Sequence, residues 1–253
     1  MRKLFGFLFV FSFLFTGLVF GQTAKIIKLE GNVEMKISET DSWQAATIGT
    51  YLKKQAEIKT KQDSSCTLAF DKKLDNLITI EEKSHLKLEE LKPAELFLPQ
   101  GRVFSIIDNL ADVGGFKVKT PVAVAGVRGT GDSVESNENG TIVKCFEGEI
   151  YVASLTKPQD PVLTEGSGVN VGPGGRIGDI FDLGSDDWRI WNRFISAINN
   201  LRGGPRQRPG KPSPFENLKG EARESIREDF FQERRKDEED RGSSTTEPSL
   251  TIE

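Results

Sequence analysis

The chain has 253 residues, a length that allows one or two domains. Only 36% of the residues are hydrophobic, which is low for a chain that folds throughout, so we expect part of it to stay unfolded. The formal net charge is −4, and nucleic-acid binding needs a basic face, so the charge argues against a nucleic-acid partner.

Residues 1–21 predict a secretory signal peptide. A positive head, Arg2 and Lys3, precedes an almost wholly apolar run over residues 4–20, and Gly21 supplies the small residue at the exit. Cleavage there removes two basic residues and no acidic one, so the net charge of −4 becomes −6. The alternative is an uncleaved membrane anchor, because about 17–20 apolar residues can span a bilayer. We favour cleavage, with export to the periplasm or cell envelope of a bacterium.

The two cysteines, Cys66 and Cys145, lie in the alternating runs "CTLAF" and "IVKC", and the alternation points both side chains inward. An exported protein can keep a disulfide, and buried cysteines also serve as small hydrophobes. We favour two free thiols, with a Cys66–Cys145 disulfide as the alternative.

Residues 22–183 predict an all-β domain, because short runs alternate apolar with polar residues and turn residues separate them. The runs are "NVEMKI", "CTLAF", "LITI", "HLKLEEL", "RVFSII", "FKVKT", "DSVES", "TIVKCF", "EIYVASL" and "GVNV". Asn139-Gly140 predicts a type I′ turn that joins "DSVES" to "TIVKCF".

A weak repeat places Gly-x-[Val/Ile] at the start of a strand. It occurs at Gly31, Gly101 and Gly148, with a looser copy at Gly168. Glycine takes the positive φ of a sharp corner at no steric cost. A recurring corner followed by a short strand predicts an irregular β-solenoid or roll.

Residues 184–202 predict an amphipathic helix with Ser185 as its N-cap and Gly203-Gly204-Pro205 as its stop. Its apolar face includes Trp188, Trp191 and Phe194, which we expect to pack on the β domain as a lid. Binding of a partner by these three aromatic residues is the alternative. Residues 203–253 predict a linker, a marginal charged helix and a disordered polar tail.

The sequence offers no arrangement of residues that predicts catalysis. The single histidine, His85, alternates with Leu86 and Leu88 and should therefore face solvent. One histidine and two inward cysteines lack the number and spacing of metal ligands. We expect no catalytic residue, no metal and no cofactor, and we interpret the protein as not an enzyme.

The stretch "FKVKTPVAVAGVRGTGDSVES…GTIVKCFEGEIYVAS" resembles the FecR domain, named after the periplasmic regulator of ferric citrate uptake. The likeness covers about residues 24–180. Its central motif lies on Phe116, Val118, Thr120, Pro121, Ala123, Val124, Ala125, Gly126, Val127, Arg128, Gly129 and Thr130. Departures are Gly131-Asp132, where an apolar residue is usual, and Gln55, where a glycine is common. The resemblance implies a β-rich, solenoid-like domain.

We interpret the motif as scaffold rather than as an active surface. An arginine fork suits free carbonyls or a carboxylate at a corner, and Glu147 in the following turn is the candidate partner of Arg128. The residues to which we assign this structural role are Thr120, Pro121, Gly126, Val127, Arg128, Gly129, Thr130, Glu147 and Gly148.

Three functions are compatible with the sequence. The leading one is an exported, non-enzymatic envelope module that binds a protein or a cell-wall glycan. The second is a transmembrane or periplasmic signal relay related to iron-uptake regulation, which needs residues 4–20 to be retained in the membrane. The third is an envelope enzyme that acts on glycans.

Overall fold

The computed structural model describes residues 23–127, 129, 131–156 and 160–204. The predictions for the signal peptide, for Arg128 and Thr130, and for the chain from Pro205 onward fall outside the described residues. The chain divides into two units, Met1–Arg202 and Gly203–Glu253, and the strands and helices described below belong to the first.

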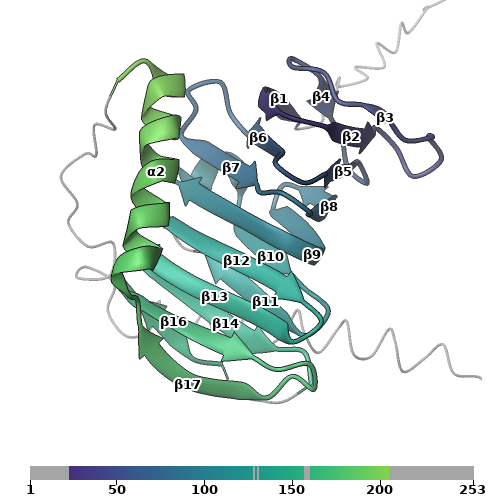
Figure 1. Ribbon diagram of the computed structural model, residues 1–253. Helices are drawn as coiled ribbons and strands as arrows, with labels where there is room; N and C mark the ends of the chain where they lie inside the picture. Colours follow the sequence, from purple (N-terminus) through teal and green to yellow (C-terminus); the bar gives the residue numbers. More distant parts are fainter. Residues whose placement is uncertain (1–22, 128, 130, 157–159, 205–253) are drawn as a thin grey trace, which may run out of the picture. The chain divides into compact units, whose positions relative to one another are not determined.

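Seventeen strands in the described residues form one continuous network that folds into two layers, here called sheet A and sheet B (Figure 1). In order, sheet A contains β4 (Tyr51–Leu52), β1 (Ala24–Glu30), β6 (Ser65–Ala69), β7 (Asn76–Ile80), the second half of β9 (Ala94–Ile107), β12 (Gly131–Asn137), β13 (Gly140–Glu147), β16 (Ser167–Val171) and β17 (Ile177–Asp182). Sheet B contains β3 (Gln44–Ala45), β2 (Val33–Lys36), β5 (Glu57–Thr60), β8 (His85–Leu91), the first half of β9, β10 (Phe116–Lys119), β11 (Ala123–Val127), β14 (Glu149–Ser154) and β15 (Val162–Thr164).

The prediction of an all-β domain is confirmed, but the solenoid or roll is not. A stack of coils would pair successive strands in parallel, whereas the pairs between described strands are antiparallel except for β9 with β10. Hairpins alternate between the two sheets instead. The turn residues 99–101 do not end a strand either, because β9 continues through them and passes from sheet B into sheet A.

The core lies between the two sheets. Inward side chains such as Ile58 and Leu96 of sheet B face Ile78 and Val103 of sheet A, and all four are fully buried. The alternation in sequence therefore marks the inner faces correctly, since each strand presents every second residue to the core.

Each crossing between the sheets carries a residue with positive φ. The predicted corners at Gly31, Gly101 and Gly148 are confirmed, with φ of 68°, 102° and 78°. The one at Gly168 is wrong, because Gly168 lies inside β16 and Gly166 makes that corner. The residues with positive φ at the crossings are Gly31, Gly49, Gln55, Asp63, Lys83, Gly101, Gly114, Gly115, Gly129, Gly148 and Gly166.

The predicted hairpin between "DSVES" and "TIVKCF" is formed by β12 and β13, but the predicted type I′ turn at Asn139-Gly140 is wrong. Asn137 pairs with Gly140, so the loop residues are Glu138 and Asn139, neither of which has a positive φ. The left-handed residue is Gly140, at φ 118°.

Two helices among the described residues, one of a single turn and one of 18 residues, complete the first unit. Helix α1 (Leu110–Val113) is a single turn between β9 and β10, and helix α2 (Ser185–Arg202) runs across the outer face of sheet A (Figure 1). The predicted helix over residues 184–202 is thus formed, and Gly203, at φ 77°, follows it as predicted.

Cys66 and Cys145 are both buried free thiols, as predicted. They lie on β6 and β13, which are four strand spacings apart in sheet A, or about 19 Å at roughly 4.8 Å per spacing. A disulfide needs Cα atoms within about 7 Å. Burial raises the pKa of each thiol to about 12.

We expect both thiols to be inert in the folded protein, because the reactive thiolate is suppressed and the sulfur atoms are buried. A colorimetric thiol assay at mildly alkaline pH should find no reactive thiol in the native chain and two after unfolding in denaturant. Finding none after unfolding without reductant would show that the two cysteines are linked.

Gly101→Ala should destabilise the domain by about 3 kcal/mol, because it combines a positive φ with a clash. A Cβ at Gly101 would lie 2.1 Å from Ser84 Oγ and 2.4 Å from Ser84 Cα. The matched control is Gly174→Ala, because a Cβ at Gly174 would have no neighbouring atom within 4 Å and the φ of Gly174 is not positive. Urea unfolding measures both variants, and equal midpoints would contradict the role of this corner.

Candidate functional site

Two features of the first unit lie outside the main core. One is the outer face of sheet A beneath α2 (Figure 1), and the other is a groove whose lining includes the β12–β13 hairpin, at strand ends far from α2. The first contains the aromatic residues that the sequence offered for partner binding. The second is formed by turns that are distant in sequence.

Trp191 and Phe194 of α2 are buried, with 2% and 7% of their surface exposed. The Trp191 ring stacks on Phe146 at 4.6 Å between centroids, and Phe194 stacks on Phe104 at 5.2 Å. Trp188 is half-buried and contacts Phe146 edge-on at 5.5 Å. The aromatic face of α2 is therefore used inside the unit, as a lid on sheet A, so Trp191 and Phe194 are not accessible to a partner.

A glycine on β12 allows this close packing. A Cβ at Gly131 would lie 2.4 Å from the Trp191 ring and 3.3 Å from the carboxyl carbon of Glu147. The departure from the family pattern at Gly131 thus has a structural reason, since a side chain there would displace α2.

The N-terminus of α2 is fixed by Asp187 rather than by the predicted cap Ser185. The Asp187 carboxylate accepts hydrogen bonds from the Gly184 amide at 3.0 Å and from Lys144 Nζ of β13 at 2.7 Å. Gly184 occupies the cap position, and a side chain three residues later reaches back to its amide. Burial alone would raise the pKa of Asp187, but the hydrogen bonds from Lys144 and Gly184 together hold it below the usual value.

Lys144→Met should weaken the domain at neutral pH and reduce its sensitivity to acid. The lowered pKa of Asp187 contributes stability above the pKa of the unfolded chain, about 3.9, and this stability is lost as the pH falls through the folded pKa. We expect a loss of about 1–2 kcal/mol at pH 7 that shrinks below pH 4, measured by urea unfolding at several pH values. A pH-independent difference would contradict this assignment.

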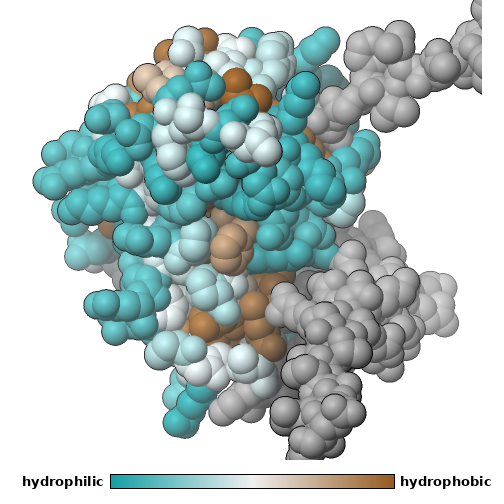
Figure 2. All heavy atoms as spheres, turned by 90° about the vertical axis from the view of Figure 1, so that its right-hand side faces the viewer, coloured by the Kyte–Doolittle hydropathy of each residue, from teal (hydrophilic) through white to brown (hydrophobic). Residues whose placement is uncertain are grey.

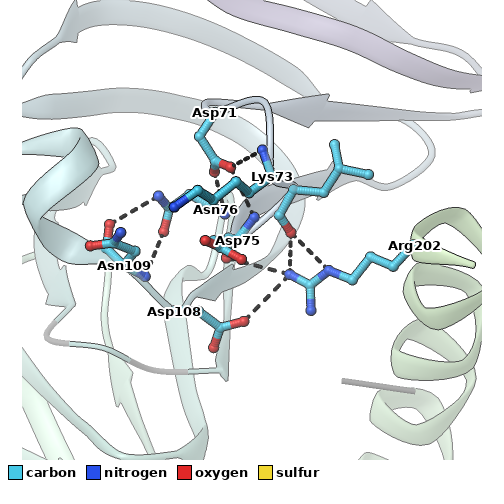
Figure 3. A network of polar contacts seen from close by, with 8 residues as sticks. Asp71, Lys73, Asp75, Asn76, Asp108, Asn109 and Arg202 are labelled. Carbon is cyan, nitrogen blue, oxygen red and sulfur yellow. Dashed lines mark hydrogen bonds and ion pairs between the residues drawn. The ribbon is translucent and has the colours of Figure 1, made fainter. Parts of the chain in front are cut away.

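The C-terminus of α2 is held by Arg202 (Figure 3). Its guanidinium donates to the Leu74 carbonyl oxygen, at 2.8 Å from Nε, and its Nη2 lies 3.4 Å from the Asp108 carboxylate. Around it, Asp71 accepts the amides of Lys73, Asp75 and Asn76, and the Asn76 side chain exchanges two hydrogen bonds with the Asn109 backbone. This network joins the β6–β7 hairpin, the segment after β9 and the end of α2, which is a scaffold role.

The described residues of the sequence motif also lie in the scaffold. Buried Thr120 accepts a hydrogen bond from the Ala123 amide at 3.0 Å and lies 2.7 Å from the Thr141 hydroxyl, so it ties the β10–β11 turn to β13. Val127 points into the core and Gly126 away from it, while Glu147 is buried beside the corner at Gly148. Arg128 and Thr130 are outside the described residues, so pairing of Arg128 with Glu147 stays a prediction.

His85 lies on the outer face of sheet B, as the alternation predicts, with 30% of its side chain exposed. Its Nε2 is 2.6 Å from Glu57 Oε2, and its ring meets Trp43 edge-on at 5.8 Å. Across the part of the chain that the structure describes, no group of three or more His, Cys, Asp or Glu side chains is arranged to hold a metal ion.

The groove has a volume of about 660 Å³. Its walls come from the bend of β9 at Pro99 and Gln100, the β10–β11 turn at Pro121 and Val122, the β12–β13 hairpin over residues 136–140, and Pro173. Figure 2 shows the side of the first unit that lies to the right in Figure 1, where a hydrophobic patch lies below a mostly hydrophilic area. The sequence indicates each turn separately. It does not indicate that these turns lie side by side, because the order of the strands in the sheets determines which turns meet.

Comparison with known proteins supports the motif. Residues 56–151 match the family model described as FecR protein. This segment includes Thr120, Pro121, Gly126, Glu147 and Gly148, and the chain therefore carries a FecR domain, as the sequence resemblance predicted. The comparison with curated proteins finds no match.

Two solved structures are similar, both of a proposed anti-sigma factor from Parabacteroides distasonis ATCC 8503. One is 14% identical, with a TM-score of 0.44, and the match covers 58% of this chain and 74% of that chain. The other is 16% identical, with a TM-score of 0.44, and the match covers 57% of this chain and 71% of that chain.

Proposed function

We propose that this chain is a non-enzymatic regulatory module of the bacterial envelope that relays a signal by contact with another protein. The observation that carries the proposal is the FecR family match over residues 56–151. It favours the signal relay over the leading interpretation of the sequence, a general envelope module. The relation to iron-uptake regulation belongs to the same proposal.

The chemistry of the described residues is consistent with a binding role. The inward residues are mostly apolar, and His85 is engaged by Glu57 and Trp43 on the outer face of sheet B. A relay of this kind acts through surfaces rather than through a reacting centre, so the turns and outer faces are the places to seek partners.

Export and membrane attachment are also part of the proposal. No helix among the described residues is both long and apolar enough to cross a membrane. Residues 4–20, which lie outside them, are the segment that would anchor a relay, and cleavage after Gly21 would instead release it.

The relay predicts a change in gene expression when the chain is removed. Transcripts should be compared among the producing bacterium, a deletion strain, and strains complemented with the wild type or with Gly174→Ala as a fold-neutral control. We expect a defined set of envelope transcripts to change on deletion and to return with both complementing chains. Unchanged transcripts in the deletion strain, with the protein normally present in the wild type, would contradict the relay.

A further inference from the structure

The groove at the far end from α2 presents polar side chains that the scaffold does not use. Gln100, Glu138 and Asn139 are exposed, and their side chains make no hydrogen bond to the described part of the chain. The volume of about 660 Å³ lies within the range of small-ligand sites, about 300–1,000 Å³.

The walls of the groove are held in place by buried hydroxyl groups. Ser136 Oγ donates to the Pro99 carbonyl at 3.2 Å and links the β12–β13 hairpin to the bend of β9. The Thr120 and Thr141 hydroxyls, 2.7 Å apart, link the β10–β11 turn to the same hairpin. The groove is thus pre-formed, which lowers the entropic cost of binding a ligand.

The chemistry of the lining restricts the ligand. Its residues include no lysine, arginine or histidine, so it does not suit a phosphate or another anion. Three wall residues, Pro99, Pro121 and Pro173, have no amide hydrogen, so these turns offer poor main-chain pairing to an extended peptide.

We propose that this groove binds a neutral oligosaccharide. Sugar hydroxyls donate and accept hydrogen bonds, and the Gln100 and Asn139 amides supply both functions while Glu138 accepts. The C–H faces of pyranose rings are apolar and match the proline rings and Val122. The inference goes beyond the proposed relay, which does not depend on this site.

The test is a nuclear magnetic resonance titration of the exported chain with three probes. They are cellotetraose, tetra-N-acetylchitotetraose and, as the competing ligand class, tetra-alanine. We expect saturable shifts from at least one sugar, confined to the amides of Gln100, Val122 and residues 136–140. A response to both sugars indicates neutral pyranosides in general, and a response to the acetylated sugar alone narrows the class to N-acetylhexosamines.

Variants locate the binding site. Asn139→Ala should weaken sugar binding about fivefold, since it removes one hydrogen-bonding amide. Gln44→Ala is the matched control, an exposed amide on β3 at the edge of sheet B, and should leave the affinity unchanged. Thermal melting of each variant verifies the fold.

Three results would overturn the proposal: no shift with either sugar at millimolar concentration, shifts with tetra-alanine alone, or sugar binding that Asn139→Ala and Gln44→Ala leave equally intact. Each leaves the relay untouched, because the titration contains no protein partner and the transcript comparison contains no sugar probe.

Discussion

The structure depends on a left-handed residue wherever the chain passes from one sheet to the other. Such a residue turns the chain sharply enough to enter the second layer after a short strand, and it costs about 1–2 kcal/mol for a residue with a Cβ. Glycine avoids that cost, and Gly31 and Gly101 have no alternative because a Cβ would meet Ser64 and Ser84. Other corners use a residue with a side chain, as at Gln55, whose amide donates to the Leu88 carbonyl at 2.6 Å.

The corners at Gly31 and Gly101 repeat one local arrangement. In the first, Ser64 Oγ accepts from the Asn32 amide at 2.8 Å, and in the second Ser84 Oγ accepts from the Arg102 amide at 3.0 Å. Each serine comes from a neighbouring corner, so the corners support one another in a row. The weak sequence repeat therefore marks where the chain changes sheets, and the same signal would arise in a solenoid.

The sequence predicts local structure well here, because alternation reports burial directly, and the runs from "NVEMKI" to "GVNV" all contain strands. Prediction from the sequence fails where the structure depends on which strands pair. Nothing local distinguishes residues 99–101 from a hairpin turn, yet β9 continues through them because both halves find partners. Asp63 and Lys83 make corners without a glycine, so a search for glycine corners misses them, whereas Gln55 makes its corner at a position where a glycine is common in the family. The groove is missed for the same reason, since its walls meet only through strand order.

The outer faces of the sheets limit where recognition can occur. On sheet A, α2 covers the buried aromatic side chains Phe104 and Phe146. The Trp191 ring of α2 lies so close to the Gly131 backbone that no side chain would fit between them, so α2 is part of the folded domain. On part of sheet B, Lys117 and Lys119 both pair with Glu95, and the three side chains are mostly buried, so the charges on this part of the face already have partners. The turns at the ends of the strands present exposed side chains such as Gln100, Glu138 and Asn139, although buried hydroxyl groups hold the turns themselves in place. A protein built in this way can change its binding properties at these turns without repacking its core.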